Sequence, residues 1–289
     1  MDAIIDRNAR AQVLVQALPY IQKYWNRVVV IKYGGHAMEN EELKAKVMED
    51  IVLLQLVGVR VVLVHGGGPD ISDVMKKMGV ESKFVDGLRV TDHETAEIAQ
   101  MVLAGKVGKS LVNLIEATGG KAMGICGIDG RMVEAKKRSE QLGFVGQITN
   151  VNTQPILDLI DKGYIPVISS VGCDSEGNVY NINADTMAAH ISGAMGAECL
   201  ISMTDVPGIM LDPDDKSSLV HVADINDATE LFRQGVIKGG MIPKVESCIE
   251  ALLCGVHKVF ILDGRVPHSI LLEMLTDEGS GTMMVGEKK

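Results

Sequence analysis

Aliphatic runs alternate with amphipathic stretches along the chain from residue 27 onward. Two of the runs, 28–32 and 59–64, are rich in β-branched residues, as in parallel strands that are buried on both faces of a sheet. Between them, residues 41–57 place apolar side chains on one helical face, and Gly58 follows as a helix-ending residue. This order of strand, helix and strand is typical of α/β proteins.

The same alternation continues to the end of the chain. It predicts an α/β fold, a three-layer αβα sandwich with a mainly parallel open sheet and two lobes. Further strands are expected at 121–127, 165–169, 199–203, 257–262 and 282–285, and further helices at 70–78, 93–104, 107–118, 153–162, 184–195, 224–235, 242–254 and 267–275. Polar, glycine-containing segments are expected to form a β-flap or hairpins at 82–91, 128–150 and 172–180.

A helical stretch at residues 8–26 precedes the first strand. Pro19 interrupts this stretch, so we expect two short helices rather than one. Because the α/β pattern begins only at Arg27, the stretch is an appendage whose apolar residues must be covered by its own domain or by a neighbouring subunit. The chain therefore divides into a helical extension at 1–26, which we expect to serve oligomerisation, and two lobes at 27–196 and 197–289.

The composition fits this architecture and narrows the class of function. Of the 289 residues, 46% are hydrophobic and only 3% aromatic, which suits an aliphatic α/β core. A formal charge of −10 argues against a surface that follows nucleic-acid phosphates. The five cysteines include no CxxC pair and no metal-ligand spacing, so we predict no protein-bound metal. With no signal-peptide pattern and no uninterrupted apolar span, we expect a cytoplasmic protein outside the membrane.

Two glycine clusters follow the first two predicted strands. Gly34-Gly35 comes just after Lys32, and Gly66-Gly67-Gly68 comes directly after His65. Glycine lets backbone N–H groups approach an anion without interference from a Cβ atom, and the carboxyl ends of parallel strands meet at one edge of a sheet. Lys32 alone is also compatible with a strand-end lysine whose stem is buried. Together these residues predict phosphoryl chemistry, although neither cluster has P-loop or dinucleotide-binding spacing.

Other polar residues are candidates for the same chemistry. Lys244 lies at a predicted helix start, where a cation is disfavoured unless an anion lies beside it. Asn181, Asn183 and Asp185 lead into another helix; one of them is expected to cap it, but a cap does not account for all three. Arg89, in the flap, either binds a substrate carboxylate or stays solvated.

Six motifs follow one another in a characteristic order: IKYGGHAM, VHGGGPDI, DGLRVTD, NINADTMAAHI, TDVPGIM and GGMIPKVESC. With these motifs, residues 27–289 resemble the amino acid kinase family and, within it, the acetylglutamate kinases. The resemblance implies phosphorylation of the side-chain carboxylate of N-acetyl-L-glutamate in arginine biosynthesis, with ATP as donor and Mg²⁺ carried by the nucleotide. It also implies that the lobe at 27–196 binds the acceptor and the lobe at 197–289 binds ATP.

The resemblance assigns a role to each candidate residue. Lys32 and Lys244 would stabilise the transferring phosphoryl group from opposite sides, Asp185 would hold both ammonium groups, and Gly35 would donate its N–H to the phosphoryl oxygens. The acceptor would be bound by Gly67, Gly68, Arg89, Asn181 and Asn183. The nucleotide would be surrounded by Thr204, Asp205, Val206, Gly208, Ile209, Val236, Ile237 and Lys238. A carboxylate acceptor is already ionised at neutral pH, so the reaction needs no general base.

The helix before the first strand extends the resemblance to those acetylglutamate kinases that are inhibited by L-arginine. These enzymes assemble as hexamers, trimers of dimers, through such helices. The resemblance places the effector pocket in the C-terminal stretch, with His268, Glu273 and Gly279 as candidate residues; an ordinary helix and turn is the alternative. Three other functions stay open at this point. They are a sister kinase for another small acid or a nucleotide monophosphate, a catalytically silent arginine sensor, and a nicotinamide dehydrogenase, whose fingerprint is missing.

Overall fold

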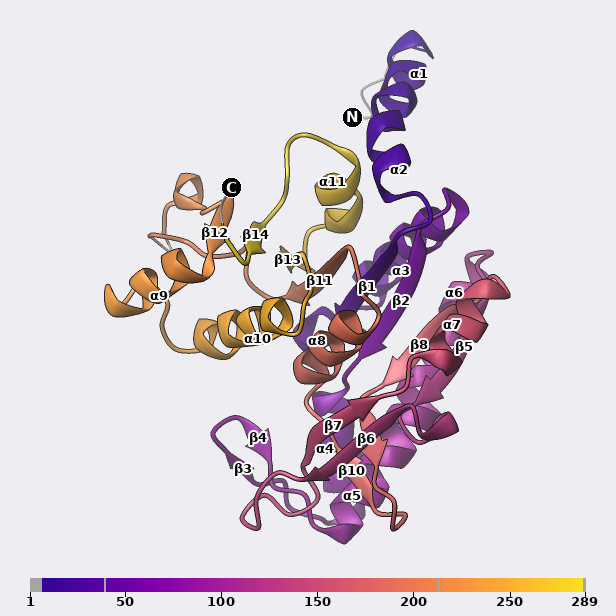
Figure 1. Ribbon diagram of the computed structural model, residues 1–289, viewed down its shortest axis with the longest axis vertical. Helices are drawn as coiled ribbons and strands as arrows, with labels where there is room; N and C mark the ends of the chain where they lie inside the picture. The colour runs from indigo at the N-terminus through magenta and orange to yellow at the C-terminus, as the bar shows by residue number, and fades with distance from the viewer. Residues whose placement is uncertain (1–6, 39, 213, 288–289) are drawn as a thin grey trace.

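The main sheet of the computed structural model, which describes residues 7–38, 40–212 and 214–287, has eight strands (Figure 1). They are β1 (Val28–Tyr33), β2 (Arg60–His65), β5 (Ala122–Cys126), β8 (Ile165–Ser169), β11 (Cys199–Thr204), β12 (Val222–Asp224), β13 (Lys258–Asp263) and β14 (Thr282–Val285). Their order in space is β12-β14-β13-β11-β1-β2-β8-β5. All neighbouring strands are parallel except β13 and β14, which confirms the mainly parallel open sheet.

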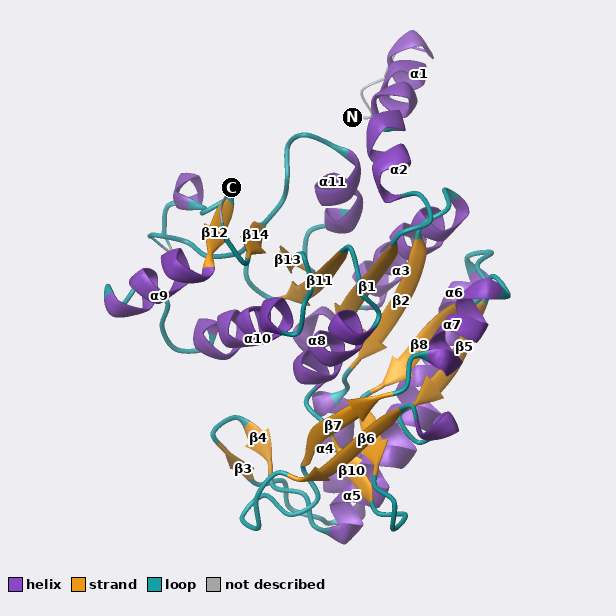
Figure 2. Cartoon of the chain, viewed as in Figure 1, coloured by secondary structure: helices purple, strands orange, loops and turns teal. Residues whose placement is uncertain are grey.

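Helices cover both faces of this sheet (Figure 2). They are α3 (Glu41–Leu56), α4 (Gly68–Met78), α5 (His93–Gln100), α6 (Gly108–Ala117), α7 (Gln154–Asp161), α8 (Ala184–Ala194), α9 (Ile225–Arg233), α10 (Met241–Leu253) and α11 (Ser269–Leu275). The faces follow from the alternation of side chains along a strand. In β1, Val29 and Ile31 belong to the core that includes α3, α6 and α11, whereas Val30 belongs to the core that includes α7, α8 and α10. The αβα sandwich is therefore confirmed.

The predicted hairpins join into a second, smaller sheet. Its strands are β6 (Val133–Lys137), β7 (Gly146–Val151), β9 (Val171–Cys173) and β10 (Val179–Asn181), in the order β10-β9-β6-β7. The two hairpins were expected separately, and a parallel pairing of β6 with β9 connects them. The flap is a short antiparallel pair, β3 (Phe84–Val85) and β4 (Leu88–Arg89), as expected.

One prediction of secondary structure is wrong between residues 93 and 118. Instead of two separate helices, the chain forms one continuous helical run, in which the π-helical segment Met101–Val107 connects α5 to α6. The i→i+5 pattern of a π segment accommodates Gly105 without ending the helix. By length and composition this run, His93–Ala117, is apolar enough to cross a membrane, but it packs against α3, α4, β5 and β8 in the core. The three-residue strand β12 was not predicted, because it is too short to show a period.

Two helices precede the sheet, as Pro19 predicted: α1 (Arg7–Gln16) and α2 (Leu18–Tyr24). Residues 1–6 of the extension lie outside the described residues. Tyr24 of α2 is buried, and the Tyr20 hydroxyl donates to the carboxylate of Asp277 beyond α11. In contrast, α1 projects from the rest of the molecule at the top of Figure 1, and Leu14 is 76% exposed.

Candidate active site

The glycine clusters and Lys32 meet at the edge where the parallel strands β1, β2 and β8 end. A cavity of about 290 Å³ lies at this edge. It is lined by most of the residues predicted to bind the acceptor or the phosphoryl group: Lys32, Gly35, Gly67, Gly68, Arg89, Asn181, Asn183 and Asp185. Segments that lie far apart in the sequence therefore form one site, as the strand-edge argument predicts.

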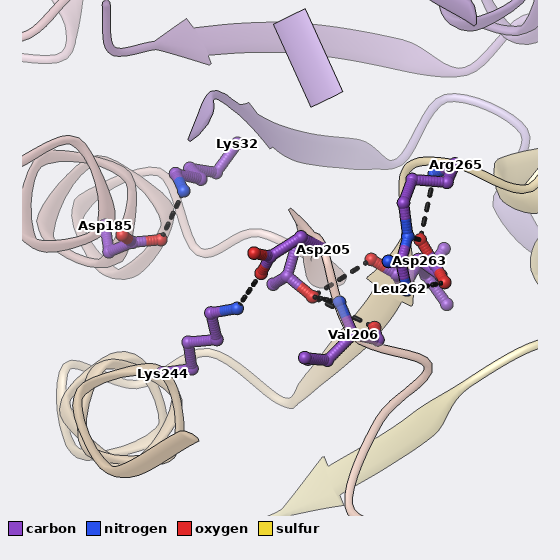
Figure 3. Close-up of polar contacts among 9 residues, drawn as sticks. Lys32, Asp185, Asp205, Val206, Lys244, Leu262, Asp263 and Arg265 are labelled. Atoms are coloured by element: carbon purple, nitrogen blue, oxygen red, sulfur yellow. Dashed lines mark hydrogen bonds and ion pairs between the residues drawn. The ribbon is translucent and has the colours of Figure 1, made fainter. Parts of the chain in front are cut away.

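Lys32 and Asp185 form an ion pair inside this cavity. The Lys32 Nζ atom lies 2.9 Å from Asp185 Oδ1 (Figure 3). Lys32 comes from the carboxyl end of β1 and is only 9% exposed, whereas Asp185 comes from the first turn of α8. The pairing compensates the burial of the ammonium group, which would otherwise be costly.

The cap of α8 is Asn183. Its side-chain oxygen accepts hydrogen bonds from the N–H groups of Asp185 and Thr186, at 2.9 and 3.1 Å. Asp185 is thereby free of the capping role, and its carboxylate faces Lys32. Asn181, at the end of β10, donates from Nδ2 to the Thr91 hydroxyl at 3.4 Å and also borders the cavity. Asn183 thus caps the helix, whereas Asp185 pairs with Lys32 and Asn181 bonds to Thr91.

The backbone of Gly66-Gly67-Gly68 forms another wall of the cavity. A Cβ atom at Gly67 would lie 2.8 Å from Leu103 Cδ2, and one at Gly66 would lie 3.2 Å from Ala184 Cβ. Gly35, at the neighbouring end of β1, has a positive φ of 70°. A side chain at Gly66 or Gly67 would crowd these neighbours, and glycine tolerates the positive φ at Gly35, so the backbone of these residues stays accessible from the cavity.

Arg89 is a buried cation whose hydrogen-bond acceptors are neutral groups. It is 7% exposed, and its guanidinium donates to the carbonyl of Gly68 at 2.9 Å and to the hydroxyls of Ser72 and Ser82 at 2.8 and 2.7 Å. It also stacks on the ring of Phe84 in the flap. No carboxylate of the described residues pairs with it, and burial lowers its pKa, although a guanidinium stays charged at neutral pH. Arg89 is therefore not the solvated flap arginine of the alternative interpretation.

Lys244 forms a second ion pair with Asp205, close to the first (Figure 3). Lys244 lies in the first turn of α10, and Asp205 follows β11 directly. Asp185 was expected to hold both lysines, but among the described residues it pairs with Lys32, and Lys244 pairs with Asp205 instead. Sequence patterns did not indicate Asp205 as a lysine partner, because the two residues come from separate motifs and meet through the packing of α10 against α8 and β13.

The loop after β11 is held by the hydroxyls of Thr204, at the end of β11, and of Thr282 in β14. The Thr204 hydroxyl donates to the carbonyl of Val206 at 3.1 Å, and the N–H of Ile209 donates to the hydroxyl of Thr282 at 2.9 Å. Gly208 has a φ of 143°, and a Cβ atom there would lie 2.5 Å from Thr282 Oγ1. Across from it, Val236, Ile237 and Lys238 connect α9 to α10, with Ile237 buried. The nucleotide-binding role of these segments stays a prediction.

The three candidate effector residues lie on or beside α11. Glu273 accepts hydrogen bonds from the N–H groups of Ser280 and Gly281, at 2.6 and 3.2 Å, and Gly279 has a φ of 62° beside it. His268 precedes the helix and pairs through Nδ1 with Asp50 of α3. Burial raises the pKa of Asp50 to about 6, and the hydrogen bond from His268 opposes this shift. The structure thus brings Glu273 and Gly279 together and directs His268 toward α3.

Several cavity-lining residues were not among the predictions, including Phe84, Leu103, Val145 and Ser170. Ser170 follows the buried strand β8, so the rule that ligands lie at strand ends would have indicated it. The others lack such a signal, since they are apolar. Among the described residues, no group of three or more His, Cys, Asp or Glu side chains is arranged to hold a metal ion. The positive charge at this site comes from lysine and arginine.

A parallel sheet covered on both faces, with glycine loops and two lysine–carboxylate pairs at its carboxyl edge, is the architecture of a phosphoryl-transfer protein. The amino acid kinase family matches residues 27–263, and the chain belongs to this family. Its relatives include acetylglutamate kinase of Brachyspira hyodysenteriae, 56% identical over 98% of this chain and 99% of that protein. Acetylglutamate kinase of a Synechococcus species is 54% identical over 97% of this chain and 90% of that protein.

A solved structure adds a more distant likeness. N-acetylglutamate synthase from Neisseria gonorrhoeae, complexed with coenzyme A and N-acetyl-glutamate, superposes with a TM-score of 0.83 at 25% identity. The likeness covers 96% of this chain and 64% of that chain. The family match and the kinase relatives confirm the predicted resemblance and the predicted class of enzyme, and the superposition agrees with the predicted fold class.

Proposed function

We propose that this protein transfers the γ-phosphoryl group of ATP to the side-chain carboxylate of N-acetyl-L-glutamate, forming an acyl phosphate and ADP in arginine biosynthesis in the cytoplasm. The observation that carries the proposal is the buried guanidinium of Arg89, which pairs with no carboxylate in the part of the chain that the structure describes and lies in the same cavity as Lys32. A buried cation that donates only to neutral groups favours an anionic ligand. Lys32 and the glycine backbone supply a second anion-binding region in that cavity.

An acceptor with two carboxylates suits these two regions. Arg89 would bind the α-carboxylate, and the side-chain carboxylate would then point toward Lys32 and the glycine N–H groups. The Neisseria synthase of similar fold is complexed with N-acetyl-glutamate, which supports this class of ligand. Asn181 lies between the flap and α8 and would donate to the acetyl or carboxylate oxygens, while Asn183 holds the start of α8.

The arrangement of charges accounts for the chemistry without a base. The nucleophilic carboxylate is ionised at neutral pH, so the site has to bring two anions together and stabilise charge on the equatorial oxygens of the transferring group. Lys32 from β1 and Lys244 from α10 approach the same region from different elements (Figure 3). The N–H groups of Gly35, Gly67 and Gly68 add donors at fixed positions.

We further propose that residues 27–196 form the acceptor-binding lobe and residues 197–289 the ATP-binding lobe. The cavity supports this division, since all of its lining residues come from the first range. In the second range, the loop that begins at Thr204 follows the end of β11, and the segment Val236–Lys238 precedes α10, which carries Lys244. Mg²⁺ would arrive bound to the phosphates of ATP, because the described residues offer no cluster of metal ligands.

A substrate panel tests the proposed acceptor. ADP formation is followed in a coupled assay with MgATP and, in turn, N-acetyl-L-glutamate, L-glutamate, L-aspartate, carbamate and a nucleoside monophosphate. The proposal expects turnover with N-acetyl-L-glutamate at least 100-fold above the other acceptors, since an unpaired buried polar group disfavours the wrong ligand strongly. Preferred turnover of another acceptor would replace the substrate, and the absence of ATP turnover would favour a sensor.

The N-terminal extension supports a proposal about regulation. Val13, Leu14 and Leu18 are 61, 76 and 50% exposed on helices that project from the sheet domain, so they offer an apolar surface for a second copy of the chain. We propose a homo-oligomer, a hexamer built as a trimer of dimers, in which these helices meet. Because α2 contacts the α11 region through Tyr20 and Asp277, L-arginine bound near His268, Glu273 and Gly279 would act on this contact.

A further inference from the structure

A chain of buried hydrogen-bonding groups lies beneath the glycine loop Gly66–Gly68. His65 is fully buried at the end of β2, and Ser169 is its register partner at the end of β8. The His65 Nδ1 atom lies 2.9 Å from the carbonyl oxygen of Gly66, and the Nε2 atom lies 3.0 Å from Ser169 Oγ. Ser169 Oγ in turn lies 3.1 Å from the carbonyl oxygen of Leu103 in the π segment.

The chemistry of these groups determines the direction of the hydrogen bonds. Burial lowers the pKa of His65 to about 4, so at neutral pH the ring carries one proton. Because the carbonyl of Gly66 can only accept, this proton is on Nδ1, and Nε2 is an acceptor. Ser169 is the donor within reach of Nε2 among the described residues, whereas the carbonyl of Leu103 also receives the N–H of Gly108. Ser169 therefore shares its one hydroxyl proton between two acceptors, His65 Nε2 and the carbonyl of Leu103, and His65 donates to Gly66.

The π segment packs on the same loop from its other side. A Cβ atom at Gly67 would lie 2.8 Å from Leu103 Cδ2 and 3.2 Å from Val107 Cγ2. A Cβ atom at Gly108 would lie within 3.2 Å of the Leu103 carbonyl, Ser169 Oγ and His65 Nε2, so only glycine lets the helix close over this network. Side-chain packing and the hydrogen-bonded chain thus constrain the loop together.

We propose that His65 and Ser169 are positioning residues, which couple the π segment Met101–Val107 to the glycine loop and orient its N–H groups toward the acceptor. Neither side chain lines the cavity, so both act through the backbone of the loop. The role in acceptor binding rests on the proposed function, but the coupling itself is a property of the fold. π segments inside α-helices occur frequently at functional sites, in keeping with this assignment.

The first test compares Ser169→Ala with Ser192→Ala as a matched control. Both serines are buried, but Ser192 Oγ has no hydrogen-bond partner among the described residues, so its removal breaks none of the hydrogen bonds described. Below the unfolding temperature of each variant, Ser169→Ala should lower kcat/KM for the acceptor about tenfold or more, because small displacements of positioning groups have large effects. Its KM for ATP should stay within twofold of wild type. In Ser192→Ala, both kcat/KM for the acceptor and KM for ATP should stay within twofold of wild type.

A purely structural role predicts a different result. Partial unfolding of Ser169→Ala would lower kcat for both substrates in proportion to the active fraction and leave both KM values unchanged. An acceptor KM and kcat within twofold of wild type would overturn the proposed role in positioning. The acceptor in this comparison is whichever acid of the panel the wild type prefers, so a failure of N-acetyl-L-glutamate overturns the proposed substrate and not this inference.

Hydrogen–deuterium exchange tests the coupling without any substrate. In Ser169→Ala, amides of residues 61–75 and of 101–108 should exchange at least tenfold faster than in wild type, and those of 241–253 should be unchanged. His65→Asn keeps an N–H donor near the Gly66 carbonyl but does not reach Ser169, so the double variant with Ser169→Ala should be no more impaired than the worse single variant. Additive effects, or unchanged exchange in both segments, would overturn the coupling.

Discussion

The ion pair of Lys32 with Asp185 has a close counterpart elsewhere in the molecule. Lys258 pairs with Glu198 at 3.0 Å, compared with 2.9 Å for Lys32 and Asp185. The side-chain exposures also match, at 13 and 25% for Lys258 and Glu198 and at 11 and 27% for Lys32 and Asp185. Lys258 begins β13, however, whereas Lys32 is near the end of β1, so the two lysines lie at opposite edges of the parallel sheet. Substituting each lysine by Met separates structural from catalytic effects.

The structure predicts similar losses of stability and very different losses of turnover. Each substitution leaves one partly exposed carboxylate without its partner, for which we expect a loss of about 1–3 kcal/mol in the free energy of unfolding, between the values for exposed and buried pairs. A cation about 4 Å from a phosphoryl oxygen contributes about 4 kcal/mol at an effective dielectric constant near 20. Lys32→Met should therefore lower kcat by roughly 10²- to 10³-fold, in the range of a lost oxyanion donor.

The assay measures ADP release at saturating MgATP and N-acetyl-L-glutamate, with the folded fraction of each variant determined by urea unfolding. Lys258→Met should keep kcat within about threefold of wild type, since its charge is a sheet length away from the reaction. If Lys32→Met, correctly folded, turned over as fast as Lys258→Met, the assignment of Lys32 to the transferring phosphoryl group would be refuted.

Three other predictions concern the helix cap, pH and assembly. Asn183→Ala should lower the free energy of unfolding by about 1 kcal/mol, measured by urea denaturation, because it removes the cap of α8. Asn183→Asp should restore most of this loss. An Ala variant as stable as wild type would contradict the capping role. Burial raises the pKa of Asp50 from 3.8 to about 6, so between pH 3.8 and 6 the folded chain binds more protons than the unfolded chain. The contribution of the Asp50 carboxyl to the free energy of unfolding therefore declines as pH rises through this range. Asp50→Asn should flatten that decline in unfolding experiments at pH 4.5 and 6.5, and an unaltered slope would show that another group causes it. Leu14→Glu should reduce the mass in solution measured by light scattering, with an unchanged unfolding midpoint for the sheet domain, since Leu14 is 76% exposed; an assembly of unchanged mass would argue against the role of α1.

Local patterns were sufficient for most of the fold. The β-branched runs at β1 and β2 are buried on both faces, and their strand bounds follow from that composition. Pro19 separated α1 from α2 because proline cannot continue the hydrogen-bonding pattern of a helix. The helical run at 93–117 was misjudged, because Gly105 is a helix-breaking signal only when no tertiary packing supports the segment around it.

The sequence indicated some features of the site and left others open, because tertiary packing decides which side chains meet there. Lys32, near the end of β1, and the glycines that follow β1 and β2 line one cavity, since strand direction alone brings them to one edge; their roles stay predictions. The environment of Arg89 was left open between two interpretations, because burial of a flap residue depends on α4 and the loop that packs on it. The pairing of Lys244 with Asp205 rather than Asp185 depends on the relative position of α8 and α10.

By itself, the sequence determined what most segments are: which long runs become strands, where most helices begin and end, and which peptide groups glycine leaves accessible. These properties follow from local sterics and from the periodicity of apolar side chains. Only the tertiary structure decided which charged groups meet and which hydrogen bonds run beneath the glycine loop. Those contacts join residues far apart along the chain, and their energies depend on burial and distance, which no local pattern encodes.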